Sequence, residues 1–192
     1  MSNISKRIQH SLESTDFIEQ AFPCLTSWGV QDEDVFMHSI GCSVWNTLGH
    51  ELGYMAVVEA PAPVAVGSDI RSDSAWFEKK TNKPLVLIEF ERYDGTSYGK
   101  SKLSEKLDNL IEAASRWENM PELIVLSAWS KDLVSAPDIS ELFNKFKNGI
   151  KNKKGININS FSNCSFLFNR FICEPDVEGL LRLEKLMFWE SP

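Results

Sequence analysis

Long apolar runs are absent from this sequence. No stretch of the 192 residues approaches the ~20 consecutive apolar residues that a membrane-spanning helix needs. The first nine residues are polar and lack the apolar segment of a signal peptide. We therefore expect no membrane partner and a cytoplasmic location.

Cysteine and histidine are also scarce, which limits the metal and disulfide chemistry to be expected. The chain has four cysteines without CxxC spacing, namely Cys24, Cys42, Cys164 and Cys173. Its three histidines are His10, His38 and His50. This pattern predicts neither a zinc knuckle nor a disulfide framework, and we expect buried free thiols.

A net positive charge is missing as well. The formal charge of -7 argues against a simple basic nucleic-acid binder, because duplex affinity depends on neutralising phosphates. Residues 1–95 carry 14 acids against 7 bases, whereas residues 96–192 carry 13 of each. A site that recruits Mg²⁺ should be locally acidic, so this distribution leaves DNA open as a substrate.

The central feature that is present is the run over residues 84–92. Its branched apolar residues predict a buried strand, which is opened by Pro84 and is followed by a turn at residues 94–95. Alternation places Glu89 and Glu91 on one face, about 6 to 7 Å apart. Buried like charges need compensation, and a divalent cation is the simplest one. The alternative is a strand end that has reached solvent, with Glu91 paired to a nearby lysine.

Two elements before this strand carry further acids. A helix is predicted over residues 43–58, with Glu51 inside its apolar stripe, although Glu51 at the edge of the stripe is an equal alternative. Residues 64–66 are expected to form a short first strand, and residues 70–77 a second strand that carries Asp73. An N-terminal packing helix is expected over about residues 2–20.

The second half of the chain predicts a crossover. An amphipathic helix over residues 99–117 bears Lys102 and precedes a buried strand at residues 123–129, which favours a partly parallel sheet. A capped helix from Asp138 to about residue 149, a strand at 165–173 and a closing helix at 176–188 follow. One basic patch is a candidate phosphate contact, with a solvated helix end as the commoner alternative: Lys145, Lys147, Lys151, Lys153 and Lys154.

The order of these elements and acids over about residues 43–129 resembles the PD-(D/E)xK nuclease superfamily. That resemblance implies an α/β, restriction-endonuclease-like fold with an αβββαβ core and a central mixed sheet flanked by helices. We expect one domain over residues 1–192, with an N-terminal helix in 1–22 and a C-terminal strand and helices in 130–192. No proline precedes Asp73, and Glu91 occupies the place of the motif lysine. Some members are similar in using Glu there, and others take a lysine from the neighbouring helix.

The resemblance implies a divalent-metal-dependent endonuclease, most simply one that hydrolyses DNA with Mg²⁺ or Mn²⁺. Asp73 and Glu89 would hold the metal, and Glu51 would complete its shell. Glu91 would position or deprotonate the attacking water, and Lys102 would offset charge on the phosphate. A homodimer is a candidate assembly. The alternative function is a non-catalytic module on a degenerate nuclease fold that binds nucleic acid or protein.

Overall fold

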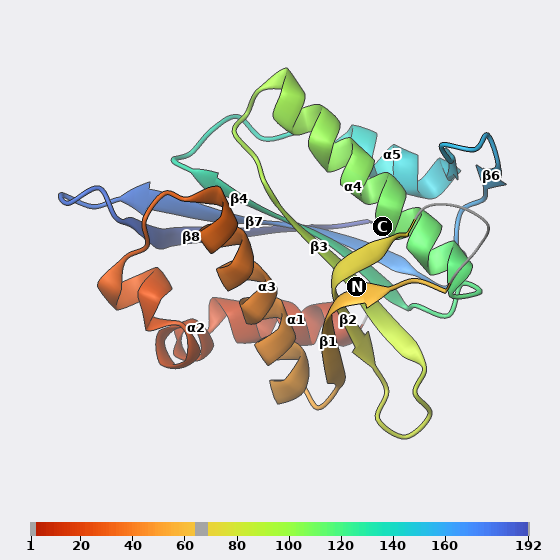
Figure 1. The fold of residues 1–192 in the computed structure, drawn as a ribbon, viewed down its shortest axis with the longest axis horizontal. Coiled ribbons are helices and arrows are strands. Elements are labelled where there is room, and N and C mark those ends of the chain that lie inside the picture. Colours follow the sequence, from red (N-terminus) through yellow and green to blue (C-terminus); the bar gives the residue numbers. More distant parts are fainter. Residues whose placement is uncertain (1–2, 64–68, 192) are drawn as a thin grey trace.

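A twisted mixed sheet with helices on both faces forms the centre of the protein (Figure 1). The computed structural model describes residues 3–63 and 69–191. The sheet has six strands in the order β1-β2-β3-β4-β7-β8. Their bounds are β1 Met55–Pro61, β2 Arg71–Phe77, β3 Pro84–Arg92, β4 Leu123–Lys131, β7 Ser165–Pro175 and β8 Leu181–Glu190.

The strand directions divide the sheet into three parts. β1, β2 and β3 form an antiparallel meander, β3, β4 and β7 are parallel, and β8 returns antiparallel to β7. The parallel neighbours β3 and β4 are joined by a helix, as a parallel crossover requires. The predictions of an α/β class and a mixed central sheet are thus confirmed.

The helices cover the two faces of the sheet with separate apolar cores. One face is covered by α1 Asn3–Glu13, α2 Thr15–Ala21, the π-helical turn η1 Cys24–Trp28 and α3 Asp34–Glu51. The other face is covered by α4 Ser97–Arg116 and α5 Ile139–Asn148. A small separate ladder pairs β5 Ile150–Lys151 with β6 Asn157–Ile158. No helix in the described residues is long and apolar enough to cross a membrane.

Helix α4 follows the predicted amphipathic pattern closely. Its buried side chains include Leu103, Leu107 and Ile111, which face the sheet at helical spacing. The Thr96 hydroxyl caps its first turn by accepting a hydrogen bond from Gly99 N at 3.1 Å. The polar residues of α4 that flank this apolar stripe therefore lie close to β3.

Helix α3 approaches β3 through a glycine. A Cβ atom on Gly41 would lie 2.0 Å from the ring of Phe90, so only glycine allows the ring to pack against the helix backbone. Phe90 itself is 2% exposed and also packs edge-on against Phe171. This close contact fixes the height and rotation of α3 over the acidic end of β3.

Two of the predicted helices are wrong, because residues expected to be helical pair in the sheet instead. The helix predicted over residues 43–58 starts earlier and ends at Glu51, after which Gly53 takes a φ of 91° and Met55–Pro61 pairs with β2. The helix predicted over residues 176–188 is the turn and strand of a hairpin. The Asp176 carboxylate accepts hydrogen bonds from Glu178 N and Leu180 N and so closes the turn, and β8 then pairs with β7.

Two smaller predictions also need comment. The single N-terminal helix is divided at Ser14 into α1 and α2. The first strand expected at residues 64–66 lies outside the described residues, and the first strand observed is β1. From α3 to β4 the elements follow the order helix, three strands, helix, strand.

Candidate functional site

Three acids lie at the same level on three adjacent strands. Glu59 on β1 and Asp73 on β2 lie opposite each other, because the residues on either side of them are paired in the β1–β2 ladder. The β2–β3 ladder ends one residue before the level of Asp73 and Glu89. Glu59 adopts a left-handed backbone conformation with φ of 49°, which is unfavourable for a non-glycine residue, although the β1–β2 register is the same on either side of it.

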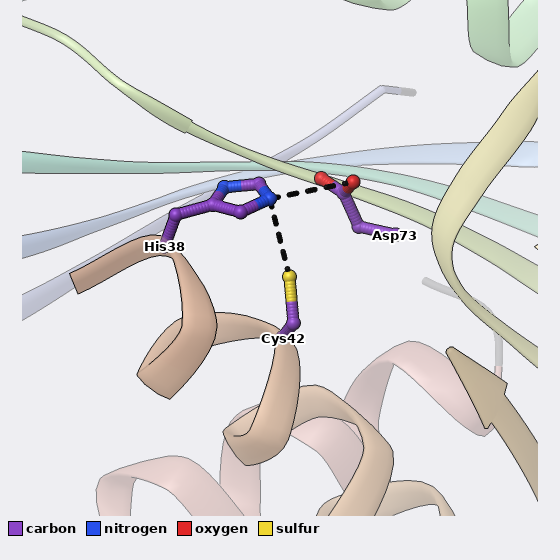
Figure 2. A group of neighbouring side chains, drawn as sticks. All are labelled: His38, Cys42 and Asp73. Atoms are coloured by element: carbon purple, nitrogen blue, oxygen red, sulfur yellow. Dashed lines mark hydrogen bonds and ion pairs between the residues drawn. The ribbon is translucent and has the colours of Figure 1, made fainter. Parts of the chain in front are cut away.

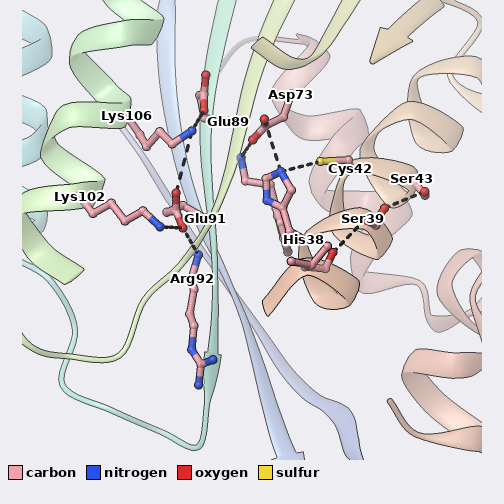
Figure 3. A network of polar contacts seen from close by, with 12 residues as sticks. His38, Ser39, Cys42, Ser43, Asp73, Glu89, Glu91, Arg92, Lys102 and Lys106 are labelled. Atoms are coloured by element: carbon pink, nitrogen blue, oxygen red, sulfur yellow. Dashed lines mark hydrogen bonds and ion pairs between the residues drawn. The ribbon is translucent and has the colours of Figure 1, made fainter. Parts of the chain in front are cut away.

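Where the β2–β3 ladder ends, the side chain of Asp73 takes the place of a backbone carbonyl as the hydrogen-bond acceptor. Its Oδ2 accepts a hydrogen bond from Phe90 N at 2.7 Å, and the residue is 7% exposed. Burial raises the pKa of Asp73, while the hydrogen bond from Phe90 N and the positive charge of Lys106 oppose that rise. One oxygen is therefore held by the backbone of β3, and the other, Oδ1, is directed towards α3 (Figure 3).

Glu89 and Glu91 face the opposite helix, as their alternation along β3 predicted. Lys106 Nζ lies 2.7 Å from Glu89 Oε2 and 3.9 Å from Glu91 Oε2. Lys102 Nζ lies 2.7 Å from Glu91 Oε1. Both lysines come from one face of α4, one turn apart, and reach β3 from the same side (Figure 3).

The burial of these charges perturbs their protonation. Burial raises the pKa of Glu89 to about 8, and the charges of Asp73 and Glu91 add to this effect while Lys106 partly offsets it. Burial alone would lower the pKa of Lys106, but the acids around it outweigh burial and raise it. Lys106 is therefore charged at neutral pH, whereas Glu89 tends to keep a proton there unless a cation compensates the acids.

Two cavities adjoin this group. The larger, of about 700 Å³, lies between α3, β3 and α4, and its lining includes His38, Glu91, Arg92, Tyr98, Lys102 and Lys106. The smaller, of about 370 Å³, has a lining that includes Asp69, Glu89, Lys106, Asn109, Lys151 and Lys153. Lys106 lines both cavities, so a ligand in either one would meet its ammonium group.

A second cluster of potential ligands lies on the α3 side of Asp73. His38 Nε2 lies 3.5 Å from Cys42 Sγ and 3.7 Å from Asp73 Oδ1 (Figure 2). Among the described residues, this is the group of three whose potential metal-binding atoms all lie within 4.8 Å of one another. Burial, followed by the charge of Asp73, raises the pKa of Cys42 to about 12.

Sequence reasoning missed His38, Cys42, Glu59 and Lys106 as members of the site. His38 and Cys42 have the i, i+4 spacing of neighbours on a helix face, but the helix was expected to begin only at residue 43. Lys106 is one turn from Lys102 and could have been found from that spacing. The position of Glu59 depends on the β1–β2 register, for which the sequence carries no signal.

Glu51 does not lie where the sequence reasoning expected it. It is an exposed residue at the C-terminal end of α3, nine residues beyond Cys42, which corresponds to about 13 Å along a helix axis. The structure brings together Asp73, Glu89, Glu91 and Lys102, with Glu59 as the additional acid in place of Glu51.

The predicted lysine patch is divided by the structure. Lys145 pairs with Asp108 at 2.8 Å, and Lys153 pairs with Glu105 at 2.6 Å, so both are held against α4. Lys151 lines the smaller cavity with Lys153. Lys147 lies in the last turn of α5, and Lys154 is an exposed residue of the β5–β6 turn.

The four cysteines are free thiols, as expected, although only Cys173 is fully buried. The carboxylates of Asp73, Glu89 and Glu59 offer oxygen ligands, whereas His38 and Cys42 offer nitrogen and sulfur. Comparison of the chain with protein-family models, curated proteins and solved structures gives no match.

Proposed function

We propose that the protein is a divalent-metal-dependent nuclease that hydrolyses phosphodiester bonds in DNA. The observation that carries this proposal is the contact of one helix lysine, Lys106, with both strand glutamates beside buried Asp73. Carboxylates and an ammonium group at the edge of a cavity provide ligands for a cation and a countercharge for a phosphate.

The order of elements supports a restriction-endonuclease-like arrangement. Helix, three strands, helix and strand occur from α3 to β4, and the acids lie on the second and third of these strands. Glu91 stands where that family has its motif lysine, and Lys106 reaches the same carboxylates from the following helix. We infer that Lys106, together with Lys102, supplies the positive charge that the strand lacks.

The residues present fit a hard divalent cation such as Mg²⁺ or Mn²⁺. Asp73 and Glu89 are buried carboxylates whose mutual repulsion contributes to the raised pKa of Glu89, and a cation between them would relieve it. We propose that these two residues hold the ion, with exposed Glu59 nearby as a further oxygen donor. A bound ion would lower the pKa of a coordinated water and polarise the phosphate.

The other residues then take distinct roles. Glu91 orients the attacking water and accepts its proton, because it lies beside Glu89 on β3 and lines the larger cavity. Lys106 balances the carboxylates before substrate binds and contacts the scissile phosphate afterwards. Lys102 lines the larger cavity from the same helix face and stabilises an adjacent phosphate.

The direct test is cleavage of plasmid DNA in Mg²⁺ by wild type, Asp73→Ala and Glu89→Ala. Both variants should lose activity by at least a hundredfold while keeping the fold, as judged by circular dichroism. Glu122→Ala is the matched control, since Glu122 is an exposed acid that pairs with Lys83 and lines neither cavity. Activity that persists in EDTA, or in both variants, would refute the proposal.

The basic patch is proposed as the outer DNA contact. Replacing Lys151, Lys153 and Lys154 with Gln should weaken binding and reduce the slope of log K against log salt, by about 0.9 for each phosphate that is no longer neutralised. The matched control replaces the three lysines of the β2–β3 turn region, Lys79, Lys80 and Lys83. An unchanged slope in the first variant would mean that these lysines are solvated surface residues that do not contact DNA.

A non-catalytic binding module remains the second candidate. It is favoured by the internal neutralisation of the site, in which each β3 glutamate already contacts a lysine of α4. DNA binding without cleavage in either Mg²⁺ or Mn²⁺ would favour this candidate over the nuclease.

A further inference from the structure

We propose that His38, Cys42 and Asp73 form a binding site for a divalent transition metal of the zinc class, which shares Asp73 with the oxygen-ligand pair on β2 and β3. The nitrogen and sulfur ligands come from one face of α3, and the oxygen ligand comes from β2 (Figure 2).

The separations of Cys42 and Asp73 from the His38 nitrogen suit tetrahedral coordination. With Zn–S of about 2.3 Å and Zn–N or Zn–O of about 2.0 Å, a tetrahedral ion separates S from N by ~3.6 Å and N from O by ~3.3 Å. The observed separations are 3.5 Å from Cys42 Sγ to His38 Nε2 and 3.7 Å from that nitrogen to Asp73 Oδ1. The third separation, from the Cys42 sulfur to an Asp73 oxygen, is within 4.8 Å against ~3.5 Å in a tetrahedral site, so these two side chains would move closer together on binding the ion.

The ligands are held in place by the fold. His38 and Cys42 are one helical turn apart, and Gly41 between them is pressed against the Phe90 ring, which fixes the rotation of α3. Phe90 N also holds Asp73 Oδ2, so Oδ1 is left directed at the imidazole. One residue of β3 therefore positions both halves of the site.

The donor atoms determine the class of metal. Thiolate and imidazole select Zn²⁺ and related ions, whereas Mg²⁺ prefers oxygen ligands and keeps its waters. His38 also lines the larger cavity, and its side chain is 38% exposed, so an ion can reach the cluster from solvent. Three protein ligands leave a fourth position for water or another ligand.

A consequence for activity rests on the proposed nuclease function. Asp73 Oδ2 is held by Phe90 N, which leaves Oδ1 for a metal, so zinc at the His38 site should compete with the Mg²⁺ that Asp73 and Glu89 are proposed to hold. Zinc would then act as an inhibitor of Mg²⁺-supported cleavage. The metal site itself does not depend on this consequence and can be tested without activity.

Cobalt provides the direct probe, because a Co²⁺–thiolate bond gives a charge-transfer absorption band in the near ultraviolet. Wild type titrated with Co²⁺ should develop this band to one equivalent and lose it when Zn²⁺ is added. Cys42→Ser should show no band, and His38→Ala should bind Co²⁺ at least tenfold more weakly. Cys164→Ser, which removes a partly buried thiol immediately before β7, is the matched control and should behave as wild type.

Several results would overturn the site. Absence of the band in wild type, its persistence in Cys42→Ser, or its loss in Cys164→Ser would each do so, provided that metal-free melting shows every variant folded. The activity measurement is separate: Zn²⁺ should slow Mg²⁺-supported plasmid cleavage by wild type, and Cys42→Ser should lose this sensitivity. Equal zinc inhibition of both proteins would contradict the competition, and absence of cleavage altogether would count against the nuclease rather than the cobalt result.

Discussion

Replacing Glu89 with Gln should change how the stability of the metal-free protein depends on pH. Glu89 has an ordinary pKa of 4.5, and burial raises its pKa to about 8 in the folded protein. Between these values the folded protein retains a proton that the unfolded chain releases. The resulting stability is therefore fully present below pH 4.5 and is lost as the pH rises through 8.

The magnitude follows from that interval. At about 1.4 kcal/mol per pH unit, the interval from 4.5 to about 8 corresponds to a change in the free energy of unfolding of about 5 kcal/mol, of which about 4 kcal/mol falls between pH 5 and pH 9, and we take these values as upper bounds. For a chain of this size each kcal/mol changes Tm by about 2 to 4 °C. Wild type should thus lose roughly 10 °C more than Glu89→Gln between pH 5 and pH 9, because glutamine does not titrate.

Neighbouring groups do not obscure the comparison. The pKa of Asp73 is also raised, and Asp73 is present in both proteins, so the difference between them reports Glu89 together with its repulsion from Asp73. The raised pKa of Lys106 contributes stability that is present below about pH 10.5 and is lost only above the range measured. Glu91 completes the set of charged groups facing Glu89 and is likewise unchanged.

The assay is differential scanning calorimetry in EDTA at fixed ionic strength, at several pH values from 5 to 9. Glu122→Gln is the control, since Glu122 is an exposed acid paired with Lys83 whose charge solvent already screens. Parallel Tm curves for wild type and Glu89→Gln would refute the reasoning, because they would mean that Glu89 titrates as a solvated carboxylate.

Two further predictions test the geometry around the site. Gly41→Ala should destabilise the protein by about 1 to 3 kcal/mol or more, because the new methyl group overlaps the Phe90 ring. Urea denaturation measures this loss, with the exposed-site variant Ser43→Ala as the control. Equal denaturation midpoints for the two variants would show that α3 does not depend on its close approach to Phe90. Lys106→Ala should lower kcat for DNA cleavage by about a hundredfold. This loss should exceed that of Lys102→Ala, since only Lys106 contacts both glutamates. A larger loss of kcat in Lys102→Ala would assign the main role to Lys102 instead.

The elements that could be predicted from the sequence are those whose local pattern and tertiary environment agree. The strand Pro84–Arg92 is buried on both faces and reads as a continuous apolar run, and α4 has one uninterrupted apolar stripe. The segment after Glu51 shows the opposite case. Its apolar residues fit a helix equally well, and pairing with β2 after Gly53 decides the outcome.

The same distinction explains the candidate site. Alternation along β3 was sufficient to place Glu89 and Glu91 together, whereas Lys102 was expected near them from the resemblance, in which some members take a lysine from the neighbouring helix. Glu59 joins Asp73 only through the β1–β2 register, and His38 only through the packing of Gly41 on Phe90. Contacts between residues far apart in the sequence leave no periodic signal, so these two residues could not be found without the structure.

The most direct test of the central claim is binding of Mn²⁺, followed by the electron paramagnetic resonance signal of the free ion. Wild type should remove Mn²⁺ from solution, whereas Glu89→Gln and Asp73→Asn should bind it at least tenfold more weakly, and Glu122→Gln should match wild type. Loss of binding in Glu89→Gln separates this site from the thiol cluster, to which Glu89 does not belong. Equal Mn²⁺ binding by wild type and Glu89→Gln would contradict the claim that the strand carboxylates hold a divalent cation.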